Sequence, residues 1–383
     1  MEWKEVTLGD FMQCNPKRTI KKGQKARKIT MDLLIPHSKT IRNWNYEPYS
    51  GGAKFQNGDT IMARITPCLE NGKHAFVSIL DKGEIAYGST EYFVFCGKED
   101  VSDNDFVYYL TKTPLFRDTA IKSMVGSSGR QRAQMDVLEN LKMFVPKDIS
   151  DQRRIASILS SLDRKIELNN KINADLEEMA QAIFKNWFVD FEPFKDGKFV
   201  DSELGMIPEG WKVGLLGELC NFKRGKNLLT KNAIDEGVPV VAGGLEPSCY
   251  HNVANTGAPV ITVSGSGANA GFMRMYHVPV WASDCSFIDI SCENFYFVYC
   301  FLKVNSQLLK HAQTGAVQPH VKPSDIHDFE LVIPDKEIIF DFQDKVKPFF
   351  DKIASIQKEN SRLFLLRDTL LPRLMSGELE IPE

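Results

Sequence analysis

One short loop carries the side chains whose types and spacing are best suited to binding DNA. It runs Gly126-Ser127-Ser128-Gly129-Arg130-Gln131-Arg132, where glycines and serines expose backbone N–H groups beside two arginines. Backbone N–H groups and arginines bind phosphates, while arginine and glutamine can also hydrogen-bond base edges. The loop is short for a plain linker, so we favour DNA contact. Its candidate contacts are Ser127, Ser128, Arg130, Gln131 and Arg132.

A second loop, at residues 314–322, occupies the corresponding place in the later half of the chain. Its polar residues differ in type from those of the first loop. Equivalent loops with different polar groups suggest two similar domains that read different features of DNA. The candidate contacts are Gln318, His320 and Lys322, which align with Arg130, Arg132 and Gln134.

Two further segments carry polar groups that could contact DNA. Residues 58–80 are expected to form two strands around a loop with an Asn-Gly turn, which is either an ordinary polar hairpin tip or a set able to read base edges. Residues 264–274 superficially resemble a dinucleotide-binding loop, but the glycine spacing is wrong and no helix of suitable length follows. The candidate contacts are Arg64, Asn71, Lys73 and His74 in the first segment and Ser266, Asn269 and Arg274 in the second.

The elements that must position these loops are two long helices. Over residues 155–188 apolar positions recur in steps of three and four without proline or glycine, which predicts an amphipathic helix of roughly 50 Å. The same apolar pattern returns 187 residues later, over residues 342–370. Pro348 interrupts this second copy, so we expect a kink or break there and a long helix that begins near Phe349.

Two groups of residues on these helices have open interpretations. Asn173 and Asn360 both lie in the apolar stripe, 187 residues apart. They are either tolerated, half-exposed positions or a pair that fixes the register of the helices at some cost in stability. Phe184, Trp187 and Phe188 end the first helix, and they either dock a partner protein or pack under the second domain.

An internal repeat sets the domain organisation. The opening Trp3–Phe11 returns as Trp211–Leu219, 208 residues later, and Leu138–Pro146 returns as Ile326–Pro334, 188 residues later. The chain is therefore predicted to run as domain, helix, domain, helix. The expected boundaries are 1–150 for the first domain, 151–190 for the first helix, 191–335 for a connector and the second domain, and 336–383 for the second helix and a tail.

The charges are distributed unevenly between the two domains. Residues 1–150 carry 22 Lys and Arg against 18 Asp and Glu, whereas residues 201–335 carry 9 against 14, within a net charge of −3 for the chain. This balance does not by itself mark a nucleic-acid-binding protein. An anionic partner must therefore be met by local patches, or share its contacts with another subunit.

Motifs for catalysis are missing from the sequence. There is no Asp/Asn-Pro-Pro-aromatic motif for methylating an amine, no phosphate-binding loop, no convincing nuclease carboxylate pair and no metal-ligand cluster. The eight cysteines are scattered, as expected for free, mostly buried thiols in a reducing cytoplasm, and no apolar run approaches a membrane span. We expect a cytoplasmic protein without catalytic residues, metal or cofactor of its own.

Several segments together are characteristic of one family: Ala182–Phe194 with Ser202–Trp211, Ala63–Lys73, Gly126–Arg132 and the ending Leu370–Leu379. With these segments the sequence resembles, nearly end to end, the specificity subunit of type I restriction–modification systems. This resemblance implies an α+β fold in which two α/β target-recognition domains are joined by two long antiparallel helices, a coiled coil with pseudo-twofold symmetry. Each domain would read one half of a split, asymmetric sequence of double-stranded DNA. Helices of roughly 50 Å suit half-sites about one turn apart.

The resemblance also implies partners. The subunit would do no chemistry itself, but would dock two methyltransferase subunits, which recruit restriction subunits that translocate and cut DNA. S-adenosylmethionine, ATP and magnesium would then belong to those partners. Three alternatives stay open: a DNA-reading subunit of another defence or modification system, a coiled-coil scaffold that does not bind DNA, and, against the missing motifs, a stand-alone DNA-modifying enzyme.

Overall fold

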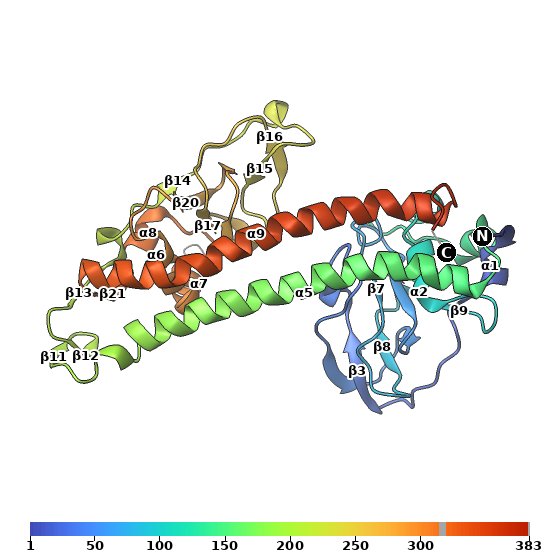
Figure 1. Cartoon of the computed structure of the whole chain (residues 1–383), viewed down its shortest axis with the longest axis horizontal. Helices are drawn as coiled ribbons and strands as arrows, with labels where there is room; N and C mark the ends of the chain where they lie inside the picture. The colour runs from blue at the N-terminus through green and yellow to red at the C-terminus, as the bar shows by residue number, and fades with distance from the viewer. Residues whose placement is uncertain (314–318, 382–383) are drawn as a thin grey trace. The chain divides into compact units, whose positions relative to one another are not determined.

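The structure, a computed structural model, describes residues 1–313 and 319–381, so the predicted contact Gln318 lies outside the described residues. The chain forms two compact units. Unit 1 comprises Met1–Asn170 with Lys358–Glu383, and unit 2 comprises Lys171–Gln357. Each unit contains β-sheets, short helices and a part of each long helix, which confirms the predicted α+β organisation (Figure 1).

The described residues of unit 1 form three β-sheets. The first strand, β1 (Trp3–Thr7), pairs antiparallel with β10 (Lys142–Pro146), which joins the start of the domain to the segment before the first long helix. The two four-stranded sheets have the orders β2-β9-β6-β7 and β4-β3-β8-β5. Their strands are β2 (Met12–Cys14), β3 (Lys25–Ile29), β4 (Asn45–Pro48), β5 (Lys54–Phe55), β6 (Thr60–Ala63), β7 (His74–Phe76), β8 (Ala86–Gly88) and β9 (Tyr92–Gly97).

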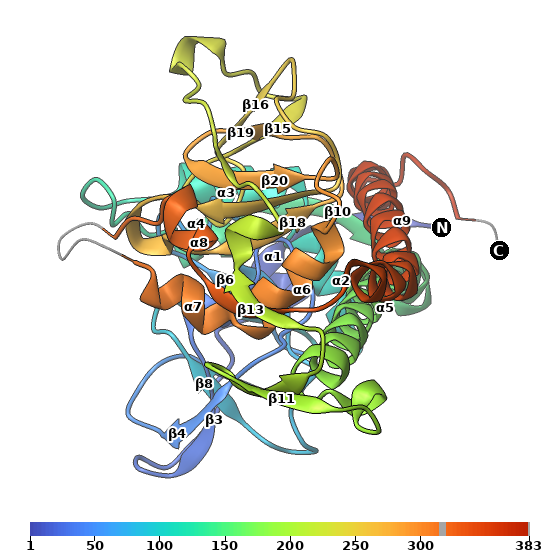
Figure 2. The same cartoon turned by 90° about the vertical axis from the view of Figure 1, so that its left-hand side faces the viewer.

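Unit 2 repeats this topology. β13 (Lys212–Leu215) pairs antiparallel with β21 (Glu330–Ile333), as β1 pairs with β10. The sheet β14-β20-β17-β18 corresponds to β2-β9-β6-β7, and a three-stranded sheet β16-β15-β19 lies beside it (Figure 2). The strands are β14 (Lys223–Arg224), β15 (Val238–Val241), β16 (Cys249–His251), β17 (Val260–Ser264), β18 (Met273–Tyr276), β19 (Trp281–Ala282) and β20 (Cys285–Asp289). A separate hairpin, β11 (Phe199–Ser202) with β12 (Gly205–Pro208), precedes them. The predicted internal repeat is thus confirmed by strand order.

Short helices complete both units. They follow the same succession, since helices after β9 and β20 lead in each case to a last strand before a long helix. In unit 1 they are α1 (Leu8–Phe11), η1 (Met31–Leu33), α2 (Asn104–Leu110), α3 (Pro114–Lys122) and α4 (Met135–Glu139). In unit 2 they are η2 (Glu192–Phe194), η3 (Leu216–Glu218), η4 (Thr230–Asn232), η5 (Gly267–Asn269), α6 (Phe295–Val304), α7 (Ser306–His311) and α8 (Pro323–His327).

The two long helices are α5 (Ile149–Phe188) and α9 (Lys336–Met375), each of 40 residues. Their contacts within unit 1 run antiparallel, because Asp163 contacts Arg367 while Asn169 contacts Asn360. The expected break at Pro348 is wrong, since α9 continues through it. A proline inside a helix costs about 3 kcal/mol, and the burial of α9 side chains on both sides of Pro348 in the core of unit 2 offsets that cost.

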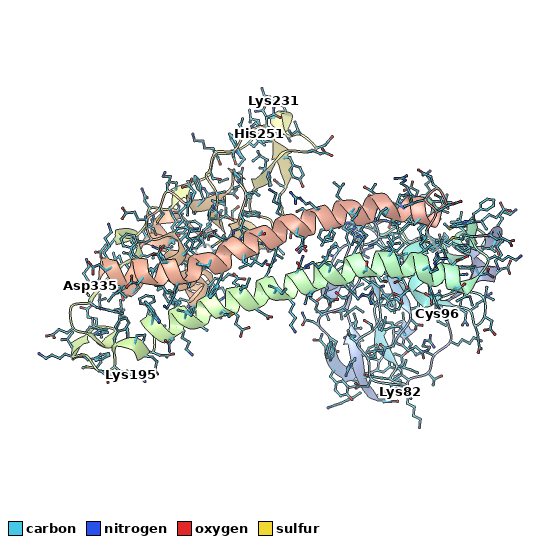
Figure 3. The ribbon with its side chains drawn as sticks, viewed as in Figure 1. Lys82, Cys96, Lys195, Lys231, His251 and Asp335 are labelled. Atoms are coloured by element: carbon cyan, nitrogen blue, oxygen red, sulfur yellow. The ribbon has the colours of Figure 1, made fainter. Side chains whose placement is uncertain are left out.

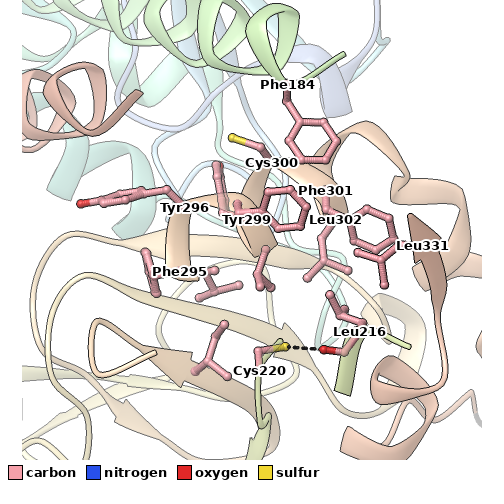
Figure 4. Close-up of a cluster of buried hydrophobic side chains, with 14 of the residues drawn as sticks. Phe184, Leu216, Cys220, Phe295, Tyr296, Tyr299, Cys300, Phe301, Leu302 and Leu331 are labelled. Atoms are coloured by element: carbon pink, nitrogen blue, oxygen red, sulfur yellow. Dashed lines mark hydrogen bonds between the residues drawn. The ribbon is translucent and has the colours of Figure 1, made fainter. Parts of the chain in front are cut away.

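The end of α5 belongs to the core of unit 2 and is not a free docking surface. Phe184 is 2% exposed and Phe188 7%, and the ring of each packs on Phe342 of α9 at 5.6 and 5.1 Å between centroids. Figure 4 shows Phe184 pointing toward Cys300 and Phe301 of α6. The partner-docking prediction is therefore wrong for Phe184 and Phe188, because large aromatic side chains gain more from burial inside the unit. Trp187 is half-buried against the same cluster.

The thiols and the helices bear on two simpler expectations. All eight cysteines are free, as expected, but half of them and not most are buried, including Cys96 on β9 (Figure 3). Burial raises the pKa of the Cys96 thiol to about 11, which keeps it protonated. Within the described part of the chain, none of the helices combines the length and the apolar character that crossing a membrane requires.

Candidate DNA-contacting loops

In unit 1 the loop 126–132 is joined to the segment that follows β6. Arg132 forms two-residue β-bridges with Ile65 and with Val125. The N–H of Thr66 donates to the carbonyl of Gln131 at 3.0 Å, and the N–H of Ala133 donates to the carbonyl of Arg64 at 2.8 Å. Two segments that sequence analysis selected separately are therefore neighbours, because main-chain hydrogen bonds connect them.

The polar side chains of this loop divide into exposed and engaged groups. Ser127, Ser128 and Arg130 are exposed, and Gln131 is half-buried. Arg132 is engaged, since its Nε and Nη2 donate to the carboxylate of Glu91 at 2.7 to 3.0 Å and its Nη1 donates to the carbonyl of Arg130 at 3.3 Å. Hydrogen bonding from Arg132 holds the pKa of the Glu91 carboxyl below its usual value, so the pair is charged.

The candidate DNA contacts around β6 and β7 differ in their exposure and in their contacts within the unit. Asn71 is exposed at the loop, as expected. Arg64 lies 5.1 Å from the centre of the Phe93 ring, and its Nε lies 3.7 Å from the Glu91 carboxylate. Lys73 uses one of its donors inside the unit, where Nζ contacts the carbonyl of Met31 at 2.6 Å.

His74 is not a surface residue, and its assignment as a DNA contact is wrong. It lies on β7, is 7% exposed and stacks on the ring of Tyr108 at 4.7 Å. Its Nε2 lies 2.9 Å from the hydroxyl of Thr111. Burial holds the pKa of His74 well below 6.5, so the imidazole is neutral. The strand begins at His74, as expected from the sequence, but its first side chain faces the core instead of the surface of the preceding loop.

Unit 2 presents the same main-chain arrangement. Ser266 and His320 form a β-bridge that corresponds to the bridge of Ile65 with Arg132. The N–H of Gly267 donates to the carbonyl of Pro319 at 3.1 Å, and the N–H of Val321 donates to the carbonyl of Gly265, also at 3.1 Å. The structure thus supports the alignment of His320 with Arg132.

The candidate side chains of unit 2 are mostly engaged within the unit. The Nδ2 of Asn269 donates to the carbonyl of Gly243 at 3.3 Å. Arg274 donates to the carboxylate of Glu246 at 3.0 Å and lies over the ring of Tyr276. Ser266 donates to the carboxylate of Asp284. Lys322 is exposed at the start of α8.

Known proteins identify the family. A family model described as the type I restriction modification DNA specificity domain matches residues 1–178 and again residues 208–363. The chain belongs to this family. The two matched segments correspond to the two copies of the internal repeat.

Similar proteins agree with this membership. The MjaIX type I restriction enzyme specificity subunit of Methanocaldococcus jannaschii is 31% identical over 304 residues, covering 73% of this chain and 70% of that protein. The HindI specificity subunit of Haemophilus influenzae is 26% identical, covering 99% of this chain and all of the relative. A crystal structure of the S subunit of a type I restriction–modification system from M. genitalium has the same fold, with a TM-score of 0.55, 18% identity and coverage of 100% and 97%.

Within this specificity-family chain, three charged residues beside the loops escaped sequence analysis. Glu91 precedes β9, Asp284 precedes the equivalent strand β20, and Arg224 on β14 forms an ion pair with Asp284. The only signal available was an acidic residue directly before the same strand in both copies of the repeat. Because Arg132 lies 41 residues from Glu91 and Arg224 lies 60 residues from Asp284, no local pattern connects these pairs.

The helix asparagines also pair differently from the prediction. Asn360 accepts from Nδ2 of Asn169 at 2.8 Å and donates to Oδ1 of Asn170 at 3.0 Å. The Oδ1 of Asn173 is buried and has no hydrogen-bond partner among the described residues. Asn360 therefore has a polar partner on the other helix, but that partner is not Asn173.

Proposed function

We propose that this chain is the DNA specificity subunit of a type I restriction–modification complex, and that each unit reads one half of a bipartite, asymmetric target. One observation carries the proposal: both units hold two loop segments together with the same main-chain bridge, Ile65 with Arg132 and Ser266 with His320. The side chains at these bridges differ. A shared backbone with different polar groups is the arrangement expected of two reading surfaces with different sequence preferences.

The exposed groups of unit 1 suit such a role. Arg130 is free to extend toward a guanine edge, where a bidentate arginine contact discriminates between bases by about 1–3 kcal/mol. Ser127, Ser128 and the surrounding backbone N–H groups suit phosphate contacts, which position the loop without reading sequence. In unit 2, the counterpart of Arg130 is Gln318, which lies outside the described residues, while His320 corresponds to Arg132 and Lys322 to Gln134.

The catalytic work would belong to partner subunits. In this proposal two methyltransferase subunits modify the target and restriction subunits cleave DNA, with S-adenosylmethionine, ATP and magnesium bound to them. The long helices offer apolar side chains for docking in place of Phe184 and Phe188. Leu365 on α9 is 71% exposed, and Leu366 and Leu168 are exposed as well. Contiguous exposed apolar patches are typical of protein-interaction surfaces, so these leucines are our candidates for such a surface.

Modification mapping tests the proposal. The chain is co-expressed with a methyltransferase subunit of the same system, and the methylated bases are sequenced across the genome. We expect a bipartite motif with a fixed gap, and we expect that exchanging residues 1–146 for those of a relative changes one half of it. A stable complex that adds no methylation, or a single undivided motif, would contradict the proposal.

A further inference from the structure

A carboxylate stands at the same place beside the reading loops of both units. Glu91 directly precedes β9 and Asp284 directly precedes β20, the equivalent strands of the two four-stranded sheets. The main chains confirm the equivalence, because the N–H of Arg64 donates to the Glu91 carbonyl at 2.9 Å and the N–H of Gly265 donates to the Asp284 carbonyl at 3.1 Å. Each carboxylate therefore lies next to its unit's β-bridge.

In unit 1 the carboxylate bonds to Arg132, the bridge residue that belongs to the loop 126–132. Glu91 accepts three hydrogen bonds from Nε and Nη2 of Arg132. With Nη1 of Arg132 donating to the carbonyl of Arg130, the partly exposed guanidinium links Glu91 to the backbone of the loop. A bidentate charged pair of this kind fixes both geometry and charge. Arg132 then supports the loop, and Arg130 remains exposed.

In unit 2 the carboxylate bonds to Ser266, the bridge residue that belongs to the segment after β17. Asp284 accepts from the hydroxyl of Ser266, which is the bridge partner of His320, and from Nη2 of Arg224 on β14. The acidic residue before the equivalent strands β9 and β20 thus bonds to one bridge residue in each unit. In unit 1 that residue is Arg132, and in unit 2 it is Ser266, the counterpart of Ile65.

We propose that Glu91 and Asp284 are equivalent positioning residues that determine half-site specificity, each by holding the β-bridge of its own unit, Ile65 with Arg132 or Ser266 with His320, in one conformation. This inference rests on the proposed function. Neither carboxylate needs to touch DNA, because Glu91 acts through Arg132 and Asp284 acts through Ser266 and Arg224. A loop held in one geometry discriminates between sequences better than a loop that adapts to several.

The neutral variants should lose selectivity rather than affinity. In Glu91→Gln the Arg132 guanidinium is released, and a free arginine binds any phosphate or guanine within reach. We expect the preference for the correct over an incorrect first half-site to fall about tenfold, the scale of one bidentate contact, while affinity for unrelated DNA stays equal or rises. Asp284→Asn should lower the preference at the second half-site by a similar factor and leave the first unchanged.

The experiment uses the full chain in complex with its methyltransferase subunits. Methylation rates are compared on duplexes with a single base pair changed in one half-site, and the half read by unit 1 is the one that changes when residues 1–146 are exchanged. Glu99→Gln is the control, because Glu99 is an exposed carboxylate beyond the other end of β9. A further comparison uses the double variant Glu91→Gln/Arg132→Gln and the single variant Arg132→Gln. Their half-site preferences should be equal if Glu91 acts through Arg132.

The outcomes separate the two levels of inference. A wild-type complex that recognises no bipartite target overturns the proposed function. A wild-type complex with a bipartite target whose half-site preferences survive both Glu91→Gln and Asp284→Asn overturns only the role of the carboxylates. Equal losses at both half-sites, or for every DNA sequence, overturn it as well, because a general loss of folding has that effect. Thermal unfolding of each variant identifies a general loss of folding. Because each unit has its own carboxylate, the two units test the role of this position independently.

Discussion

Lys112 should destabilise unit 1, and replacing it with methionine should stabilise the protein. The Nζ of Lys112 is buried without a hydrogen-bond partner among the described residues and lies 5.5 Å from the centre of the Tyr108 ring. Unit 2 has the same pair at the same spacing, with Lys303 5.7 Å from the ring centre of Tyr299, but there Nζ also contacts the carboxylate of Glu177 at 3.0 Å. One lysine is paired and its counterpart is not.

The magnitude follows from the pKa of Lys112. Burial, with a further contribution from Arg367, lowers that pKa from 10.5 to about 8. At about 1.4 kcal/mol per pKa unit, holding the charged form in the folded state costs on the order of 3 kcal/mol at pH 7. Losing the contact with Tyr108 costs about 1 kcal/mol. Lys112→Met should therefore stabilise unit 1 by about 2 kcal/mol.

The effect has a defined pH window. Between pH 8 and pH 10.5 the unfolded chain binds a proton at Lys112 that the folded chain does not, so wild-type stability rises with pH across this window. At pH 10 the cost of the charge falls below about 1 kcal/mol, and the advantage of Lys112→Met should vanish. Lys303→Met removes the cation beside Glu177 and should destabilise unit 2 by about 1 kcal/mol at pH 7.

Unfolding in guanidinium chloride, followed by hydrogen exchange, measures the free energy of unfolding of both units in one experiment. Peptides from residues 104–122 report unit 1, and peptides from residues 295–311 report unit 2. Lys303→Met is the matched control, since it makes the same change at the equivalent position. The reasoning is refuted if Lys112→Met destabilises unit 1 at pH 7, or if its effect is the same at pH 7 and pH 10.

Three further predictions concern other contacts. Arg367→Gln should destabilise unit 1 by about 3 kcal/mol in the same unfolding assay, because it leaves the buried Asp163 carboxylate, 2.7 Å from Nη1, without its cation; a change below 1 kcal/mol would contradict this. Asn173→Leu should stabilise the chain by about 1 kcal/mol, since it removes an unpaired buried Oδ1, whereas Asn360→Leu should destabilise it by a similar amount by breaking its bonds to Asn169 and Asn170; equal signs would disprove the pairing. Arg130→Ala should weaken discrimination at one half-site only, measured by binding to duplexes altered in either half; a uniform loss for all sequences would make Arg130 a phosphate contact.

Periodicity and repetition were enough to predict the order of domains and long helices, whereas the antiparallel packing of the helices was implied by the family resemblance. The steps of three and four in residues 155–188 specify an amphipathic helix because the apolar stripe must be buried, and the gapless repeat predicts the second. Pro348 misled the prediction because a local rule competes with tertiary packing, which the sequence does not reveal. His74 failed for a related reason. The strand begins at His74, as expected, but which face of it is buried depends on its packing against Tyr108, which the sequence does not reveal.

The contacts of individual polar groups could not be predicted from the sequence. The pairing of Arg132 with Glu91 joins residues 41 apart, and each residue alone is an ordinary surface charge. The composition of the loop 126–132 identified a polar surface, but it did not distinguish the arginine that supports the loop from the arginine that is exposed. That distinction depends on which guanidinium finds a carboxylate, and only the folded chain determines it.

Comparison of the two units suggests how one framework accommodates different reading chemistry. At the bridges, the hydrogen bonds that hold the loop segments together run between main-chain groups, such as Thr66 to Gln131 and Gly267 to Pro319. Main-chain bonds do not depend on side-chain identity, so the bridge survives when its residues change from Ile65 and Arg132 to other types. The side-chain partners differ freely around it. A frame made of backbone hydrogen bonds therefore leaves the polar side chains available to set sequence preference, without requiring a new fold for each target.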